Sequence, residues 1–274
     1  MKIAAIGTYV PRQCGIATFT HDLCNAISTE LEAPDACLVV AVNDRPQGYA
    51  YSDQVRFEIR QTEVGDYHLA ADFVNVRGAD LLLVQHEYGI FGGEAGNHLI
   101  GMLRDASVPV VSTMHTVLRD PSPIYRRATH QLIDLSDKIV VMADRAAEIL
   151  QEQYNVDAER ISVIPHGIPD MPFIDPSYYK DQFGLESRKV LLTFGLLSPG
   201  KGIENVIRAL PEIVRKHPDV VYVVLGATHP HVRASRGEEY RHELQRMAKE
   251  LGVSQHLLFQ NRYVNLKELC EFLG

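Results

Sequence analysis

Short apolar runs alternate with amphipathic helical patterns through the first 165 residues of this 274-residue chain. Residues 37–43 and 80–86 are the clearest apolar runs. Strands this apolar are buried on both faces, which is typical of a parallel sheet covered by helices. The pattern therefore predicts an α/β fold. The predicted strands are 3–9, 37–43, 57–61, 80–86, 108–115, 138–142 and 161–164, and the predicted helices are 18–31, 66–76, 97–105, 123–135 and 144–154.

The alternation breaks at residues 166–188, which contain Pro169, Pro172 and Pro176 and show little periodicity. We expect this segment to be an interdomain linker between a first domain at 1–165 and a second at 189–274. Three strands make a thin sheet, so the second domain looks incomplete. Its predicted strands are 190–194, 219–225 and 256–260, and its predicted helices are 201–216 with a kink at Pro211, 238–251, and one from residue 266.

Composition narrows the class of protein. The net charge of −8 argues against nucleic acid as the main partner. No apolar run approaches the roughly 20 residues of a membrane helix, and Met1 leads directly into a predicted strand without a signal peptide. The cysteines show no close pairing in sequence, so we expect a reduced, cytoplasmic setting. They are Cys14, Cys24, Cys37 and Cys270.

The segment LLTFGLLSPGKG, residues 191–202, combines a strand, a glycine-bearing turn and a helix start. Unpaired backbone N–H groups and the helix dipole attract an anion there, and the ammonium of Lys201 adds a full charge. The segment therefore predicts a phosphate site. A solvated first-turn lysine is the plainer alternative.

Together with this loop, three further segments resemble retaining glycosyltransferases of family 4, group 1, which have the GT-B fold. They are the first loop at 11–17, the TMHT strand end at 113–116, and the IPHGI segment at 164–168. The resemblance covers the whole chain and implies two Rossmann-like domains facing a cleft. In that family the first domain binds the acceptor and the second binds a nucleotide-sugar donor.

The resemblance implies roles for residues of the first domain. The first loop would lie near the donor phosphate or the acceptor, and Gly15 would let its backbone approach closely, unless Gly15 is a plain turn glycine. His115 would contact the donor sugar, unless it is a core histidine. His86 and Glu87 end the neighbouring strand and are acceptor-site candidates, although the glycine-rich run after them is also compatible with a simple flexible connection.

In the second domain, Lys201 matches the family lysine that contacts the donor diphosphate and stabilises the leaving group. The family usually has an arginine five residues earlier, where this chain has Leu196. Further donor-site residues that the resemblance implies are Ser198, Gly200, Gly202, Gly226, Arg262 and Tyr263.

Two features have plainer interpretations. Glu204 suits the positive end of a helix dipole. The His229-Pro230-His231 segment lacks three convergent ligands, so we interpret it as a surface loop and expect no metal cofactor.

The family's pair of glutamates eight positions apart, and its C-terminal helix that crosses back to the first domain, have no counterpart in these residues. We therefore expect a truncated chain with impaired turnover. The predicted activity is retaining transfer of a hexosyl group from a nucleotide diphosphate sugar to a carbohydrate or lipid-linked acceptor. A lipid-linked acceptor implies peripheral membrane contact.

Alternatives remain. A nucleotide-sugar epimerase or a phosphorylase of the same fold fits the sequence. A non-catalytic fragment or partner subunit that binds sugar nucleotides also fits, and Leu196 and the missing glutamate pair favour it. A dinucleotide-dependent oxidoreductase fits poorly, because the first loop lacks G-x-G-x-x-G. The one feature in its favour is Asp44 as a ribose contact, and that residue alone is weak support.

Overall fold

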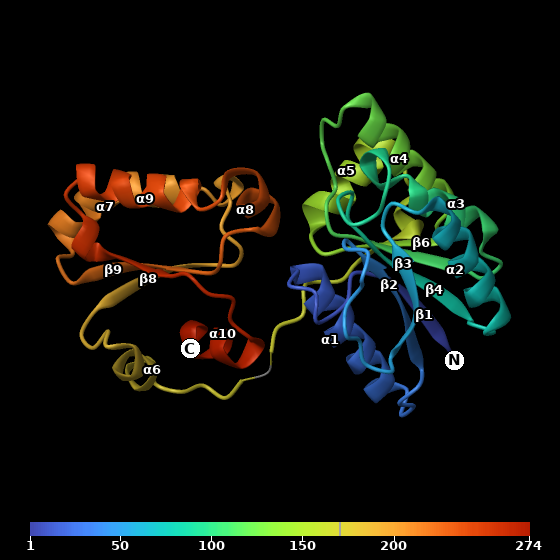
Figure 1. The fold of residues 1–274 in the computed structure, drawn as a ribbon, viewed down its shortest axis with the longest axis horizontal. Helices are drawn as coiled ribbons and strands as arrows, with labels where there is room; N and C mark the ends of the chain where they lie inside the picture. Colours follow the sequence, from blue (N-terminus) through green and yellow to red (C-terminus); the bar gives the residue numbers. More distant parts are fainter. Residues whose placement is uncertain (170) are drawn as a thin grey trace. The chain divides into compact units, whose positions relative to one another are not determined.

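The computed structural model describes residues 1–169 and 171–274. It contains two compact units, Met1–Gly167 and Ile168–Gly274 (Figure 1). Each unit has its own parallel sheet, with strand order β3-β2-β1-β4-β5-β6-β7 in the first and β10-β9-β8 in the second. This confirms the predicted α/β fold with two Rossmann-like units.

The elements of the first unit agree closely with the predicted alternation. The strands are β1 (Ile3–Gly7), β2 (Cys37–Asn43), β3 (Val55–Arg60), β4 (Leu81–His86), β5 (Val110–Met114), β6 (Lys138–Val141) and β7 (Ile161–Val163). The helices are α1 (Gly15–Glu30), α2 (Val64–Val76), α3 (His98–Asp105), α4 (Pro123–Asp134) and α5 (Asp144–Tyr154), with short 3-10 turns η1 (Glu94–Gly96) and η2 (Ala158–Arg160).

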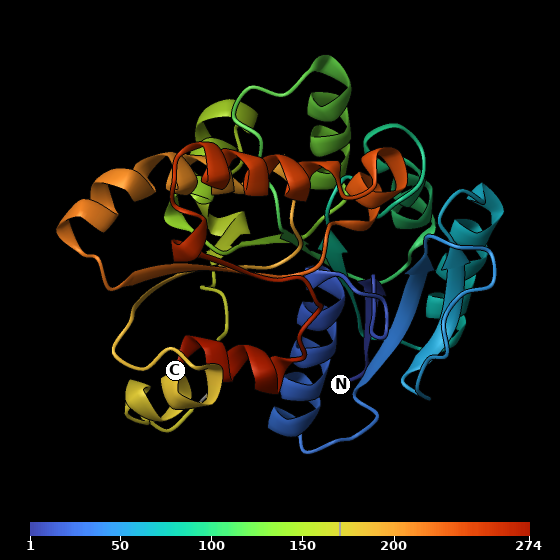
Figure 2. The same cartoon turned by 60° about the vertical axis from the view of Figure 1, so that its left-hand side comes forward.

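Side chains alternate between the two faces of this sheet, as the period of a strand requires. Ile3 and Ala5 of β1 pack with Cys24 of α1 in one apolar cluster. Ala4 and Ile6 belong to the other, larger cluster, to which α2, α3, α4 and α5 contribute. Helix α1 thus covers one face and the remaining helices cover the other (Figure 2).

The second unit is smaller. Its strands are β8 (Lys189–Phe194), β9 (Val220–Leu225) and β10 (Leu257–Gln260). Its helices are α6 (Pro176–Phe183), α7 (Ile203–Lys216), α8 (Pro230–Arg236), α9 (Glu239–Glu250) and α10 (Leu266–Leu273), with 3-10 turns η3 (Pro199–Lys201) and η4 (Ser254–His256). Helices α7 and α9 lie on one face of the sheet, and α6 and α10 lie on the other (Figure 1).

The segment predicted as a linker, 166–188, contains helix α6, and the division between the units follows Gly167. The side chain of Asp175 accepts a hydrogen bond from Ser177 N at 2.8 Å, which caps the helix, and Gly184 ends it with φ +64°. Phe183 and Leu185 pack on the small sheet. Most of this segment therefore belongs to the second unit.

Helix α7 runs from Ile203 to Lys216 with Pro211 inside it, and the kink expected at Pro211 stays a prediction. One smaller expectation for the second unit differs from the structure. The segment interpreted as a surface loop at His229-Pro230-His231 runs into helix α8, which begins at Pro230.

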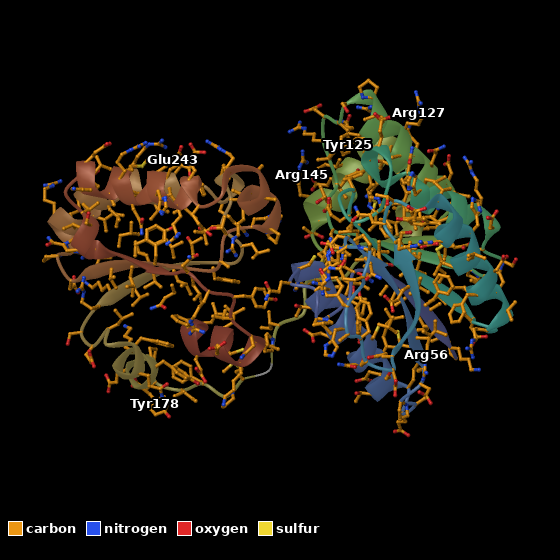
Figure 3. The ribbon with its side chains drawn as sticks, in the orientation of Figure 1. Arg56, Tyr125, Arg127, Arg145, Tyr178 and Glu243 are labelled. Carbon is orange, nitrogen blue, oxygen red and sulfur yellow. The ribbon has the colours of Figure 1, made fainter. Side chains whose placement is uncertain are left out.

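Charged side chains such as Arg127 on α4 and Arg145 on α5 project outward from the helices (Figure 3). No helix among the described residues is both long enough and apolar enough to cross a membrane.

Candidate functional site

In the second unit, the loops that follow the three strands are tied together by backbone hydrogen bonds. Gly195 N donates to Leu225 O at 3.0 Å, and Leu197 N donates to Ala227 O at 2.9 Å. Gly226 N donates to Gln260 O at 2.9 Å. The carboxyl ends of β8, β9 and β10 therefore form one connected edge. Ligands of open α/β sheets bind at such edges.

Two glycines allow the backbones of this edge to meet. Gly226 has φ +148°, and a Cβ atom placed on it would lie 1.9 Å from Gly195 O. Gly195 itself has φ +106°. Both values lie in the region that L side chains rarely adopt, so this corner requires glycine at both positions. Because neither glycine has a side chain, the backbone at the end of β8 is not covered by a side chain of its own.

Lys201 places its ammonium over this bare backbone. Its Nζ lies 3.4 Å from the position that a Cβ of Gly195 would occupy. Lys201 N donates to Ser198 O at 3.0 Å, and Gly202, with φ +63°, is the N-cap residue of α7 and offers no side-chain cap. No ion pair of Lys201 is found among the residues that the structure describes. The uncapped helix and the free ammonium together favour an anion.

The other residues predicted at this edge have different surroundings. The Nη1 of Arg262 donates to Glu268 Oε1 at 2.5 Å, so the guanidinium already has a carboxylate partner. Tyr263 is 41% exposed. Glu204 accepts from the Tyr240 hydroxyl at 2.7 Å, and this hydrogen bond lowers the pKa of the carboxyl group. Glu204 thus has a structural partner in addition to the helix dipole.

In the first unit, His115 follows β5 directly. Its Nε2 lies 2.9 Å from Gln85 Oε1, and its ring meets Phe19 of α1 edge to face at 4.9 Å. Burial, with a smaller contribution from nearby His166, lowers the pKa of His115 to about 4. The imidazole is therefore neutral near neutral pH.

His86 and Glu87 end β4 beside it. His86 is 3% exposed and stacks on Phe91, and burial lowers its pKa to about 3. Glu87 is partly exposed and accepts from the Thr116 hydroxyl at 2.5 Å. Of the two predicted acceptor-site residues, His86 is buried and only Glu87 has a side chain that reaches the surface.

Gly15 is the first residue of α1 and is exposed. The N-cap residue Cys14 makes no capping hydrogen bond, and the first turn has no acidic residue, so the N–H groups of this turn have no side-chain acceptor. The preceding loop is held by Arg12, which donates to Val42 O at 3.1 Å and lies 3.4 Å from Asp44. Asp44 thus has two partners, Arg12 of the first loop and the Tyr49 hydroxyl, which donates to it at 2.9 Å.

Sequence reasoning missed Gln85, Phe19 and Gly7. Gln85 gives a signal in the sequence, because it is a polar residue at the end of an otherwise apolar strand. Phe19 and Gly7 give none, since their roles depend on contacts with residues distant in the sequence, His115 for Phe19 and Gln85 for Gly7.

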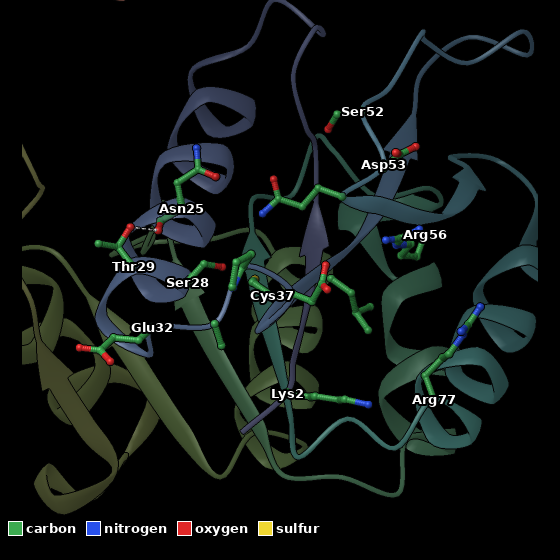
Figure 4. Close-up of a pocket in the computed structure, with 15 residues that line it drawn as sticks. Lys2, Asn25, Ser28, Thr29, Glu32, Cys37, Ser52, Asp53, Arg56 and Arg77 are labelled. Atoms are coloured by element: carbon green, nitrogen blue, oxygen red, sulfur yellow. Dashed lines mark hydrogen bonds between the residues drawn. The ribbon is translucent and has the colours of Figure 1, made fainter.

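A surface depression of the first unit, of about 1130 Å³, lies at the opposite end of the sheet from His115 (Figure 4). Its lining includes Lys2, next to the start of β1, and Cys37, at the start of β2. It therefore lies at the amino ends of the strands, away from His115. Among the described residues, no group of three or more His, Cys, Asp or Glu side chains could hold a metal ion.

Comparison with known families identifies both units. The Glycosyltransferase Family 4 profile matches residues 15–170, and the Glycosyl transferases group 1 profile matches residues 178–273. The first of these alone covers more than half of the chain.

Curated relatives carry related names. The chain is 28% identical over 177 residues to the GDP-mannose-dependent alpha-(1-6)-phosphatidylinositol monomannoside mannosyltransferase of Mycolicibacterium smegmatis, covering 62% of this chain and 44% of that protein. It is 28% identical over 195 residues to the D-inositol 3-phosphate glycosyltransferase of Corynebacterium glutamicum, covering 64% and 44%. The chain thus spans less than half the length of these relatives.

Solved structures share the fold. HepE of Anabaena, in complex with UDP, matches with a TM-score of 0.70 at 18% identity, covering 98% of this chain and 71% of that one. Sucrose-phosphate synthase of Thermosynechococcus elongatus matches with a TM-score of 0.73 at 14% identity, covering 99% and 73%. Taken with the two matching profiles, these similarities show that the chain belongs to glycosyltransferase family 4, group 1, and has the GT-B fold.

Proposed function

We propose that this protein transfers a hexosyl group, with retention, from a nucleotide diphosphate sugar to a carbohydrate or lipid-linked acceptor. Family membership supports the reaction class. The observation that carries the proposal is the unpaired ammonium of Lys201 over the glycine corner at the end of β8.

In this proposal the diphosphate docks against Lys201 and the start of α7. Ser198, Gly200 and Gly202 supply the turn in which backbone N–H groups face the phosphates. Negative charge grows on the leaving diphosphate as the glycosidic bond breaks, and a fixed ammonium stabilises it. Gly226 keeps the adjacent backbone clear, while Arg262 and Tyr263 border the nucleobase.

His115 would contact the donor sugar. Because its ring is neutral near neutral pH, it can accept a hydrogen bond from a sugar hydroxyl. Gly15, at the uncapped start of α1, would let the backbone approach the donor phosphate, and Glu87 would face the acceptor together with the end of β4 at His86.

The relatives bear on the choice of donor and acceptor. One is named for GDP-mannose and a phosphatidylinositol mannoside, and HepE was solved with UDP. We infer that the donor is a UDP- or GDP-sugar and that a polyol or its lipid-linked form is the acceptor. A lipid-linked acceptor would bring peripheral contact with a cytoplasmic membrane face. Turnover by these 274 residues alone is proposed to be poor.

Calorimetric titration tests the proposal directly. We expect the full chain to bind UDP-glucose or GDP-mannose and not NAD. Lys201→Gln should weaken binding at least about tenfold, since it removes a charge-assisted contact to the diphosphate. Lys249→Gln, at an exposed position in the last turn of α9, is the matched control and should change nothing.

The outcomes separate the candidate functions. Binding of NAD in place of both nucleotide sugars would refute the proposal. Binding without measurable sugar transfer fits both the poor turnover proposed for these residues and the non-catalytic role that Leu196 favours, whereas transfer at a normal rate would contradict both.

A further inference from the structure

A fully buried glutamine lies beneath the candidate donor-facing histidine. Gln85 is the fifth residue of β4 and has no exposed surface. It pairs in register with Thr113 of β5, two residues before His115. Its side chain therefore lies at the carboxyl edge of the sheet, within reach of the imidazole.

The position of Gln85 is set by close packing from the neighbouring strand. A Cβ atom added to Gly7, at the end of β1, would lie 3.0 Å from Gln85 Cβ and 3.6 Å from its Cγ. Since β1 and β4 are hydrogen-bonded neighbours, the glutamine stem is confined on that side. Its amide has few alternative positions.

The imidazole is held by contacts from several directions. His115 N donates to His86 O at 3.0 Å, which fixes the backbone. The Thr116–Glu87 hydrogen bond ties the next residue to the end of β4. Phe19 packs edge to face on the ring, and the ring of His166 also contacts Phe19, with a centroid distance of 5.1 Å. The titratable groups near the ring are therefore His86, His166 and Glu87.

The hydrogen bond to Gln85 decides which ring nitrogen carries the proton. Gln85 Oε1 can only accept, so His115 Nε2 must donate, and in a neutral ring Nδ1 then has no proton. Nδ1 of His115 has no hydrogen-bond partner among the described residues, and it is not one of the fully buried side-chain nitrogen and oxygen atoms that lack a partner. It remains available as an acceptor.

We infer that Gln85 is a positioning residue that fixes the Nε2-protonated tautomer of His115 and leaves Nδ1 to accept a hydrogen bond from a hydroxyl of the donor sugar. This inference rests on the proposed function for the identity of the ligand. The tautomer itself depends only on the first unit. Of the two polar atoms of the Gln85 amide, Oε1 is paired with the imidazole and Nε2 has no hydrogen-bond partner among the described residues.

The first test needs no ligand. In the full chain labelled with ¹⁵N-histidine, the His115 signals are identified by their loss in His115→Asn. We expect wild-type His115 to be Nε2-protonated. Gln85→Leu should remove that preference, so that the Nδ1-protonated form becomes comparably populated. Gln85→Glu should raise the pKa of His115 by at least about one unit, because a carboxylate stabilises the imidazolium.

Gln151→Glu, the same substitution at an exposed position of α5, is the control for added charge and should move neither quantity. An Nδ1-protonated ring in the wild type, as a turned amide would require, overturns the inference. Unchanged tautomer and pKa in both folded Gln85 variants also overturn it.

The second test separates positioning from general stability. Gln85→Leu should weaken binding of UDP-glucose or GDP-mannose about tenfold and leave binding of UDP or GDP within about twofold of wild type. Equal losses for sugar nucleotide and free nucleotide would overturn the sugar-directed role. If the wild type binds no nucleotide sugar, the proposed function fails, whereas the tautomer measurement still decides whether Gln85 orients His115.

Discussion

Two neighbouring histidines, His86 and His115, have lowered pKa values because they are buried at the end of the first sheet. Protonating either one in the folded state is unfavourable. The unfolded chain therefore binds more protons than the folded chain between about pH 6.5 and the folded pKa. Stability should fall as the pH falls through that window.

We expect the first unit to lose up to about 1.4 kcal/mol of unfolding free energy per pH unit for each of these histidines below pH 6.5. His86→Leu should reduce this loss, because it removes one titrating group from the core. Urea unfolding between pH 7 and pH 5 measures the slope. His130→Leu, at an exposed position of α4, is the control. Parallel curves for wild type and His86→Leu would contradict the assignment.

Among individual residues, those in sequence motifs could be predicted, whereas those that act by contacting a residue far away in the sequence could not. Lys201 and His115 were found because they follow strands in recognisable loops. Gln85 contacts His115 across β4 and β5, thirty residues apart. No local pattern contains that pairing, since it depends on strand order.

Among the elements, α6 shows how proline can mislead. The cluster of prolines at 169–176 predicted an unstructured linker, yet Pro176 occupies the first turn of α6, where its missing N–H costs nothing. The helix has 8 residues, too few for a clear periodicity. The informative signals were Asp175 before it and Gly184 after it.

We expect Asp175→Ala to destabilise the second unit by about 1 kcal/mol, because it removes the N-cap hydrogen bond to Ser177. Asp181→Ala changes an exposed acid near the other end of the same helix and should cost nothing, since an acid there opposes the dipole. Chemical denaturation of both variants gives the comparison. Equal effects would mean that the cap does not stabilise α6.

Elements with strong periodicity were predicted well. The strands β2 and β4 and the helix α5 match their predicted ranges within about a residue, whereas α1 begins at Gly15, three residues earlier than expected. That difference matters for function, because it puts Gly15 on the helix itself. Helix ends depend on capping, which the first loop does not provide through a side chain.

For the whole molecule, the apolar clusters fall into two sets that do not mix. Two lie in the first unit and two in the second. A chain with separate cores need not unfold in one step.

We therefore predict two unfolding transitions, of which that of the second unit gains more stability from UDP than that of the first. At a UDP concentration of 100 times the dissociation constant, the second unit should gain about 2.7 kcal/mol. Hydrogen exchange read separately for β1–β7 and β8–β10 resolves the two units. CDP, a pyrimidine nucleoside diphosphate of the same charge, serves as the comparison ligand. Equal protection of both units would contradict independent unfolding.

The contact between Gly7 and Gln85 has a consequence for how this enzyme family member could be altered. A single methyl group at residue 7 would press on Cβ of Gln85, which would have to yield by a few tenths of an ångström, and we expect that shift to alter the position of the amide that contacts His115. A mutagenesis library restricted to side chains that touch sugar would never sample that position. Buried strand positions such as Gly7, and not only the loop residues that contact the sugar, are therefore positions to vary when specificity is redesigned.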